Sequence, residues 1–272
     1  MKLFIFGLGF SGQAVARQQR GLGHRVVGTQ RAPSTTPDVL RFGDGVTLPA
    51  GALDGVTHLL STIPPGPDGD PVLAELARHG PLPDLIWTGY LSTTGVYGDW
   101  GGEWVDEDSE LRGHSPRSAA RIDAERAWLD SGLPVHVFRL GGIYGPGRSP
   151  LDQVRNGTAH RIVKPGQVFG RIHVDDVAGV VAASMARPEP GTIYNVCDDE
   201  PTPPQDVIAY AADLLGVPPP PEIAWEQAEA TLSPMARSFY ADNKRVSNRR
   251  IKERLGYRLL YPSYREGLRV LL

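Results

Sequence analysis

A glycine-rich turn near the start of the chain carries the clearest chemical pattern in the sequence. Gly7, Gly9 and Gly12 follow the apolar run Leu3–Phe6 in the spacing Gly-x-Gly-x-x-Gly. Between a strand and a helix, these glycines permit a tight turn, close approach of a ligand to the backbone and close packing of the helix, whose free N–H groups attract phosphate. A chance cluster of glycines in a loop is the alternative. The residues predicted to hold the pyrophosphate of a dinucleotide are Gly7, Gly9, Phe10, Ser11 and Gly12.

The next apolar run ends in residues that bear on the form of the dinucleotide. Proteins that prefer NAD usually place Asp or Glu at this point, whereas the first carboxylate after the turn here is Asp38. Thr29 and Arg31 instead offer a hydroxyl and a guanidinium that suit a 2′-phosphate, so we predict NADP over NAD, with a solvated loop charge as the alternative for Arg31. Asp44 is predicted to reach the adenine amino group, or else to be a turn residue. Thr62 completes the predicted cofactor site.

Five segments occur in an order typical of one protein family. They are FGLGFSG at 6–12, STTGVYG at 92–98, FRLGGIYGPG at 138–147, RIHVDDVA at 171–178 and YNVCDDEPTP at 194–203. With the segment 243–268, they resemble the extended short-chain dehydrogenase/reductases, a family of nucleotide-sugar epimerases and dehydratases, over nearly the whole chain. Extended members usually carry Gly-x-x-Gly-x-x-Gly, whereas Phe6 stands here at the first glycine position. This departure resembles the atypical members of the family, in which the catalytic set is poorly kept.

The resemblance implies a catalytic Ser or Thr and a Tyr-xxx-Lys pair on the following helix. The matching hydroxyl is Thr93, for which a turn-capping role is the alternative. Arg117 and Arg121 occupy the Tyr and Lys positions, and arginine stays protonated, so Arg117 cannot act as the acid or base. We expect Arg117 to contact substrate and Arg121 to hold the cofactor at the catalytic centre, with plain surface charges as the alternative. Tyr97 is a candidate for the lost tyrosine, although the family usually packs this residue beside the cleft.

Three further residues are predicted to contact the substrate. Tyr144 lies just past the strand that, by the resemblance, ends near the nicotinamide. Arg148 and Arg171 carry guanidinium groups suited to a phosphate or a carboxylate. The acidic loop Glu103–Glu110 is either a lid over this cleft or a solvated surface loop.

A parallel sheet is needed to bring these residues together. The predicted strands are Leu3–Phe6, Arg25–Thr29, His58–Thr62, Leu85–Thr88, Val135–Leu140 and Ile193–Val196. The predicted helices are 11–21, 71–79, 117–131, 175–187, 203–215 and 244–255. Several strands are apolar throughout, as expected where helices cover both faces of a sheet. The alternation therefore predicts an α/β fold with a doubly wound parallel Rossmann sheet and a smaller C-terminal substrate lobe.

The pattern of the chain changes after residue 142. Segment 143–170 is rich in glycine and proline without a clear period, and Pro218–Pro221 reads as a stiff connector. We therefore expect a dinucleotide-binding domain formed by residues 1–142 and 171–198. Residues 143–170 and 199–272 are expected to form the smaller substrate-binding lobe.

Composition excludes several classes of partner. The net charge of −3 gives no general attraction to nucleic acid or to anionic lipid. Cys197 is the only cysteine and the seven histidines show no metal-type spacing, so we expect no metal site and a reducing, cytoplasmic compartment. The first apolar run stops at Gly7, so we expect neither a signal peptide nor a membrane span.

Two functions from different classes fit these observations. The first is an NADP-dependent oxidoreductase or epimerase/dehydratase acting on a sugar-like or nucleotide-linked small molecule. The second is an NADP-binding sensor or regulatory protein without turnover, which the absent Tyr-xxx-Lys pair favours. The Thr93 region and the expected small lobe favour the first, because a sensor has no need of a substrate pocket. A homodimer is an open possibility for either.

Overall fold

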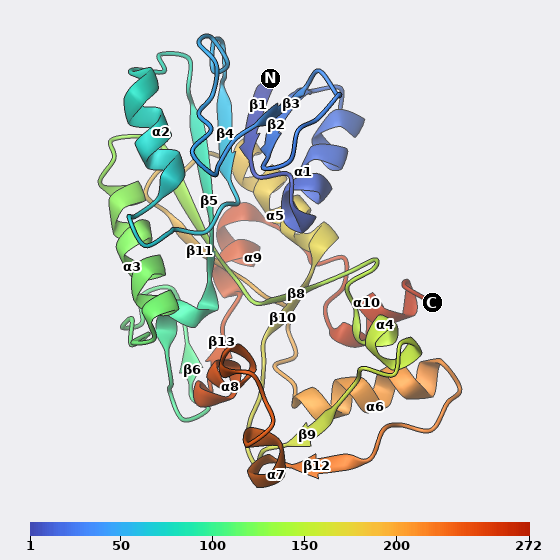
Figure 1. Ribbon diagram of the computed structural model, residues 1–272. Helices are drawn as coiled ribbons and strands as arrows, with labels where there is room; N and C mark the ends of the chain where they lie inside the picture. The colour runs from blue at the N-terminus through green and yellow to red at the C-terminus, as the bar shows by residue number, and fades with distance from the viewer.

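The computed structural model describes the chain from Met1 to Leu272, apart from the side chain of Met235. At its centre lies one seven-stranded sheet, in which every neighbouring pair is parallel (Figure 1). From edge to edge the strands are β11 (Ile193–Val196), β7 (Val135–Leu140), β5 (Trp87–Thr93), β4 (His58–Ser61), β1 (Lys2–Phe6), β2 (Arg25–Gln30) and β3 (Val39–Arg41). The predicted α/β fold with a parallel Rossmann sheet is confirmed.

Helices cover both faces of this sheet, which explains why its strands are apolar throughout. Along β1, Leu3 and Ile5 pack in the core beneath α1 (Phe10–Gly21) and α5 (Val174–Ala186). Phe4 and Phe6 alternate with them and pack in a second core with α2 (Pro71–His79) and α3 (Pro116–Leu129). Successive side chains of a strand point to opposite faces, so each strand here must supply two cores at once. Figure 1 shows the two helix layers on either side of the strands.

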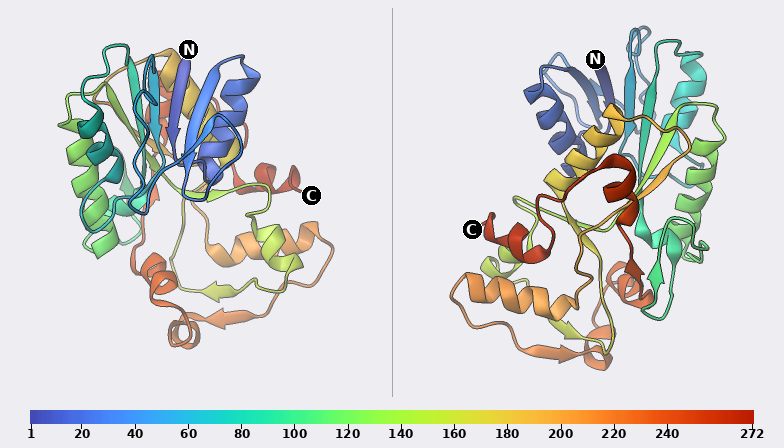
Figure 2. Two further views of the ribbon diagram at one scale, coloured as in Figure 1. Left: turned by 45° about the horizontal axis from the view of Figure 1, so that its top comes forward. Right: turned by 180° about the vertical axis from the view of Figure 1, so that it is seen from behind.

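A smaller half of the molecule lies beyond the carboxyl ends of the strands (Figure 2). Its elements are α4 (Pro150–Arg155), β9 (Arg161–Val163), α6 (Pro204–Leu214), β12 (Glu222–Ala224), α7 (Trp225–Glu229), α8 (Pro234–Ala241) and α10 (Tyr264–Arg269). Leu151 of α4, Val207 of α6 and Leu268 of α10 share one buried core, and β9 pairs with β12. Between the halves, β8 (Gly142–Tyr144) and β10 (Arg171–His173) form a parallel pair.

The structure corrects the predicted helix over 244–255. Residues Arg245–Val246 form a short strand, β13, which pairs with β6 (Trp104–Val105), and helix α9 then covers only Arg249–Leu255. The backbone N–H of Arg245 donates to the carbonyl of Glu103, and that of Ser247 donates to the carbonyl of Val105. These bonds to a distant segment replace the first helical turn, which a local pattern cannot foresee.

Two strands of the sheet also differ from the sequence prediction. The predicted strand at 85–88 begins two residues later and continues to Thr93 as β5, which leads directly into the 3-10 turn η1 (Thr94–Tyr97). Strand β3 was not predicted, because three residues in a polar, proline-containing stretch carry no clear period. Within the described part of the chain, every helix is too short or too polar to span a bilayer.

Candidate functional site

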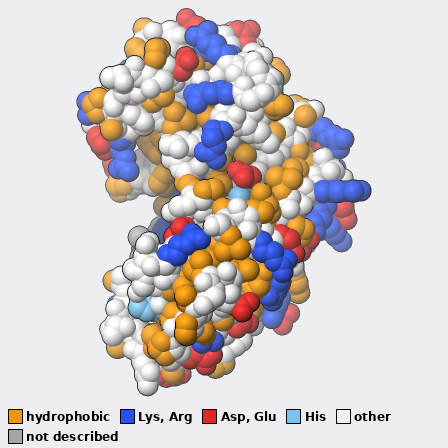
Figure 3. Space-filling model, turned by 90° about the vertical axis from the view of Figure 1, so that its right-hand side faces the viewer, with side chains coloured by type: hydrophobic (Ala, Val, Ile, Leu, Met, Phe, Trp, Pro, Cys, Tyr) orange, Lys and Arg blue, Asp and Glu red, His pale blue; other side chains and the backbone are white. Residues whose placement is uncertain are grey.

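A cavity of about 990 Å³ opens between the sheet and the smaller half. It lies at the carboxyl ends of β4, β5 and β7, where parallel sheets bind ligands, and the surface is indented between the two halves (Figure 3). Of the residues predicted from the sequence, it brings together Gly9, Phe10, Ser11, Thr62, Thr93, Arg117, Arg121, Tyr144, Arg148 and Arg171. The remaining predicted residues lie outside its lining: Gly7, Gly12, Thr29, Arg31, Asp44 and Tyr97.

The glycine turn has the geometry that a diphosphate requires. Gly7 adopts φ +93°, and a Cβ on Gly12 would lie 2.1 Å from the carbonyl oxygen of Gly7, so both positions need glycine. Around Gly9 there is nothing within 4 Å of a Cβ position, so its backbone faces open space. No side chain caps the N-terminus of α1, and its first turn holds no acidic residue. The free N–H groups of this turn are therefore available to an anion.

The structure corrects the role predicted for Thr29. This residue is fully buried, and its hydroxyl accepts the N–H of Gly7 at 2.9 Å. Thr62 holds the same turn from the other side, because its hydroxyl donates to the carbonyl of Gly7 at 2.7 Å. Thr29 thus shapes the turn and cannot reach a 2′-phosphate.

Arg31 and Asp44 lie together at the outer edge of the sheet. Arg31 is exposed, and its Cγ lies 3.3 Å from the Cβ position of Gly43, so its side chain runs beside the turn that carries Asp44. Among the described residues no carboxylate forms an ion pair with Arg31. Asp44 adopts φ 53° and is exposed, which fits the turn role that was the alternative for it.

Three consecutive hydroxyls at the end of β5 have different partners. Ser92 donates to the carboxylate of Glu125 at 2.5 Å, and Thr94 donates to the carbonyl of Leu140 at 3.3 Å. The Thr93 hydroxyl accepts the N–H of Gly95 at 3.1 Å and lines the cavity. Within the described structure, its own proton has no acceptor. Thr93 therefore caps the turn and still has a hydroxyl hydrogen to offer a ligand.

Both arginines at the Tyr and Lys positions line the cavity. Nη1 of Arg121 donates to the hydroxyl of Tyr90 at 3.1 Å and to the carbonyl of Leu91 at 2.9 Å, which fixes the guanidinium at the carboxyl end of β5. Arg117 lies nearer the smaller half, with its Cζ 5.8 Å from the ring centroid of Phe239 on α8. The two side chains thus contact different parts of one cavity.

The structure also corrects the catalytic role considered for Tyr97. Its side chain is fully buried behind the cavity, where its hydroxyl donates to Asn195 at 2.7 Å and accepts from Arg139 at 2.9 Å. Burial raises the pKa of Tyr97 to about 12, although the charge of Arg139 opposes that shift. Arg139 in turn forms a buried ion pair with Glu125 at 2.8 Å. Tyr97 is therefore a structural tyrosine, which is the role the family usually gives it.

The three predicted substrate contacts differ in what they present to the cavity. The hydroxyl of Tyr144 is buried against α10, where a Cβ on Gly267 would lie 1.9 Å from it, so it does not face a ligand. Arg171 donates to the carbonyls of Phe169 and Thr202 at 3.0 and 3.1 Å. Arg148 reaches back to the glycine turn, with its Cζ 5.5 Å from the ring centroid of Phe10.

Several cavity residues escaped the sequence analysis, among them His114, Tyr240 and Lys244. His114 is exposed at the cavity wall, and its Nδ1 donates to the carbonyl of Arg112 at 3.3 Å. Tyr240 and Lys244 line the opposite wall; burial raises the pKa of Tyr240 and lowers that of Lys244. Tyr240 and Lys244 have the Tyr-xxx-Lys spacing of the family's catalytic pair, which the sequence alone could have revealed. They do not share a helix face, however, because α8 ends at Ala241.

The position of His114 follows from two backbone hydrogen bonds. The N–H of Arg112 donates to the carbonyl of Tyr97 at 3.2 Å, and that of Gly113 donates to the carbonyl of Val96 at 3.0 Å. These bonds lay the segment before α3 across the turn that follows Thr93. His114 is thereby held at the same end of β5 as the free hydroxyl.

No known family model matches the chain. Two curated proteins are similar to part of it. A 3-diazoavenalumate denitrifying reductase from a Streptomyces species is 30% identical over 60% of this chain and 58% of its own length. The chain therefore spans less than two thirds of that relative. Protein YeeZ of Escherichia coli K12 is 29% identical over 80% of this chain and 85% of its own length.

Solved structures match almost the whole chain. A conserved protein of unknown function from Silicibacter pomeroyi is 50% identical, with a TM-score of 0.90 over 99% of this chain and 97% of its own. An NAD-dependent epimerase/dehydratase from Methylobacillus flagellatus, so named provisionally, is 25% identical, with a TM-score of 0.71 over 99% of this chain and 97% of its own. The human epimerase family protein SDR39U1, solved with NADPH, shares the fold at 20% identity, with a TM-score of 0.78 over 100% of this chain and 99% of its own.

The parallel sheet, the open glycine turn and the cavity beside it define a dinucleotide-binding protein of the Rossmann type. The chain resembles the NAD-dependent epimerase/dehydratase family: it is similar over almost its whole length to the Methylobacillus flagellatus protein and shares the fold of human SDR39U1. The match covers both halves of the molecule.

Proposed function

We propose that the chain is an NADP-dependent oxidoreductase of this family, acting on a small, sugar-like or nucleotide-linked substrate. One observation carries the proposal: the uncapped glycine turn opens into the same cavity as Thr93, Arg117 and Arg121. Residues 1–142 and 171–198 would bind the cofactor, and residues 143–170 and 199–272 the substrate. A sensor needs only a cofactor site, whereas this cavity extends beyond the glycine turn to α4 and α8 of the smaller half.

The residues of the turn suit the two phosphate groups of the cofactor. The N–H groups at Gly9, Phe10 and Ser11 would hold the diphosphate, and Arg31 the 2′-phosphate. When bound, the nicotinamide supplies a hydride to the substrate. Arg121 stays charged and is already fixed by Tyr90, so it would hold the ribose hydroxyls without giving up a proton.

Thr93 and His114 would share the work of the missing tyrosine. The Thr93 hydroxyl donates a hydrogen bond to the substrate oxygen and so polarises the carbonyl. Because Nδ1 of His114 donates to a backbone carbonyl, its Nε2 is the nitrogen left to give a proton to that oxygen.

The proposed substrate class draws on the neighbours of the fold. MoeE5 was solved with UDP-glucuronic acid and NAD, at 19% identity and a TM-score of 0.77 over 99% of this chain and 97% of its own. In this chain the α4 side of the cavity carries the amides and hydroxyl of Gln153, Asn156 and Thr158, groups that hydrogen-bond to sugar hydroxyls. The name of the Streptomyces relative supports reduction as the reaction type.

The test is oxidation of NADPH in the presence of a panel of aldehydes, ketones and nucleotide sugars. We expect turnover on at least one of them and a loss of roughly a hundredfold or more in kcat for Thr93→Val. Thr231→Val, which removes an exposed hydroxyl between α7 and α8 that does not line the cavity, is the matched control. His114→Gln should also lower kcat, because it removes the proposed proton donor.

The sensor remains the second candidate, favoured by the arginines at the Tyr and Lys positions. Tight NADPH binding, without oxidation of NADPH by any member of the panel, would favour it. If Thr93→Val turns over as fast as the unmodified protein, the proposed role of Thr93 is contradicted, but the proposed cofactor site is not.

A further inference from the structure

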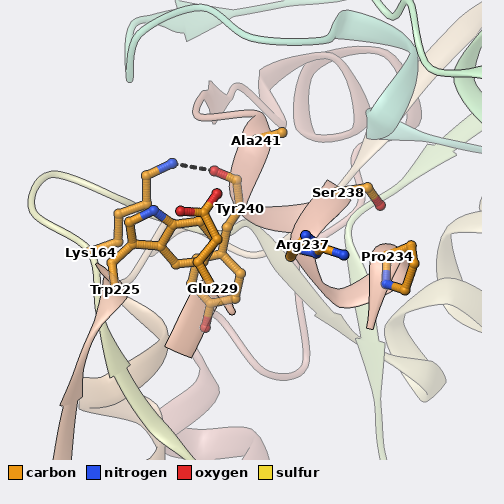
Figure 4. Close-up of a pocket in the computed structure, with 8 residues that line it drawn as sticks. All are labelled: Lys164, Trp225, Glu229, Pro234, Arg237, Ser238, Tyr240 and Ala241. Atoms are coloured by element: carbon orange, nitrogen blue, oxygen red, sulfur yellow. Dashed lines mark hydrogen bonds between the residues drawn. The ribbon is translucent and has the colours of Figure 1, made fainter. Parts of the chain in front are cut away.

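A second, smaller hollow lies on the far side of α8 and has no part in the proposed function. Its volume is about 440 Å³. Its lining consists of Lys164, Trp225, Glu229, Pro234, Arg237, Ser238, Tyr240 and Ala241. Figure 4 shows the rings of Trp225 and Tyr240 beside Glu229 on one side of the space, with Arg237 and Pro234 on the other. We refer to it as the side pocket.

One wall of the side pocket is a fixed aromatic surface. The rings of Trp225 and Tyr240 stack with centroids 5.0 Å apart and an angle of 30° between their planes. Lys164 holds the pair, because its Nζ lies 5.0 Å from the ring centroid of Trp225 and donates to the backbone carbonyl of Tyr240. The ring of Tyr240 also makes an edge-to-face contact with that of Phe169, with centroids 5.3 Å apart. An aromatic surface fixed in this way suits a flat ring, which gains contact area at little cost in side-chain entropy.

Two cations without acidic partners face the same space. Among the described residues, no carboxylate lies within ion-pair distance of Lys164 or of Arg237. An anionic group on a ligand would form charge-assisted hydrogen bonds with them. The lining also contains one carboxylate, Glu229, which would repel a group of high negative charge such as a diphosphate. A single negative charge is therefore the best match.

We propose that the side pocket is a binding site for a small, flat aromatic carboxylate. The ring stacks on Trp225, and the carboxylate binds Lys164 and Arg237. Ser238, Tyr240 and Ala241 line both this pocket and the main cavity, so the bound ring lies one helix away from the proposed substrate. This site is independent of the proposed chemistry and stands or falls separately from it.

The test is calorimetry of the NADPH-bound protein with 2-naphthoate. Cyclohexanecarboxylate keeps the charge without the aromatic ring, and 2-naphthalenemethanol keeps the ring without the charge. We expect 2-naphthoate to bind at least about tenfold more tightly than either. Trp225→Leu and Arg237→Gln should each weaken it by about tenfold or more, while Arg126→Gln, which removes an exposed cation of α3, should not.

A spectroscopic measurement keeps the proposal testable if a variant folds poorly. The indole N–H resonance that disappears in Trp225→Leu should shift when 2-naphthoate is added to the unmodified protein. The proposal is overturned if 2-naphthoate fails to bind, if that resonance stays in place, or if cyclohexanecarboxylate binds equally well. The proposal is also overturned if uridine monophosphate shifts the same indole resonance at a lower concentration than 2-naphthoate does, because the side pocket would then select a nucleotide.

Discussion

Thr29 is buried, so Arg31 is the predicted side chain that could distinguish NADP from NAD. Its exposed guanidinium has no ionic partner among the described residues, so a 2′-phosphate would gain a charge-assisted contact. We predict that NADP binds more tightly than NAD, and that Arg31→Ala removes most of the difference. Calorimetry with both dinucleotides measures this. Equal affinities in the unmodified protein would contradict the prediction, and Arg25→Ala, an exposed arginine at the other end of β2, is the matched control.

Asp198 is a buried carboxylate whose titration couples stability to pH. It is 2% exposed, and burial raises its pKa from 3.8 to about 8, although the charge of Arg171 opposes that shift. Between these values the folded chain keeps a proton that the unfolded chain releases. Its contribution to stability is therefore complete below about pH 4 and is lost as pH rises toward 8, by at most about 1.4 kcal/mol per pH unit.

The prediction for Asp198 concerns how the free energy of unfolding changes with pH. Asp198→Asn should be nearly isosteric and neutral, so it should lose less stability than the unmodified protein between pH 5 and about pH 8. Urea unfolding at several pH values measures the difference. Parallel curves for the two proteins would show that Asp198 keeps an ordinary pKa.

In the turn between β1 and α1, Gly12 is needed for packing, whereas Gly9 leaves open space for a ligand. A Cβ on Gly12 would lie 2.1 Å from the Gly7 carbonyl oxygen, so Gly12→Ala must displace the helix or the turn. A Cβ on Gly9 would meet nothing within 4 Å, so Gly9→Ala should leave the fold intact. We predict that Gly12→Ala lowers both the melting temperature and NADPH affinity, and that Gly9→Ala lowers NADPH affinity alone. Thermal melts and calorimetry distinguish them; an unchanged NADPH affinity in Gly9→Ala would argue against the diphosphate site.

Elements with a strong local pattern could be predicted from the sequence, and those fixed by distant partners could not. β1, β2 and β7 are apolar runs buried on both faces, so their composition alone reveals them. β13 forms only because β6 offers backbone partners 141 residues earlier in the chain, at Trp104 for Arg245. The spacing of apolar residues within one segment does not reveal a pairing with such a distant segment.

The same distinction holds for the candidate site. The glycine turn and Thr93 were found because their chemistry is local to a single strand end. Tyr97 and Thr29 carry the right chemical groups, but the sequence does not show that both are buried and already bonded. His114 and Lys244 were missed because the contacts that bring them to the cavity cross the whole chain; Lys244, for example, donates to the carbonyl of Gly98.

The two halves of the molecule meet at the glycine turn through Arg148. This residue belongs to the smaller half, yet its guanidinium lies beside Phe10 in the glycine turn, and among the described residues it has no carboxylate partner. We predict that Arg148→Gln weakens NADPH binding by about tenfold, because a cation beside the diphosphate is lost. Arg155→Gln, on the exposed side of α4, is the control. A change confined to the KM of the substrate would instead show that Arg148 serves the substrate alone.

The order of strands in the sheet has a consequence for synthesis. β1 is the first strand made and occupies an interior place; β2 and then β3 add to one side of it, and β4, β5, β7 and β11 add in turn to the other. Every strand therefore joins a free edge of what precedes it, and none has to be inserted between two strands already paired. A chain leaving the ribosome can build this sheet outward as it emerges, and the glycine turn is framed by β1, β2 and β4 once about the first quarter of the protein has been made.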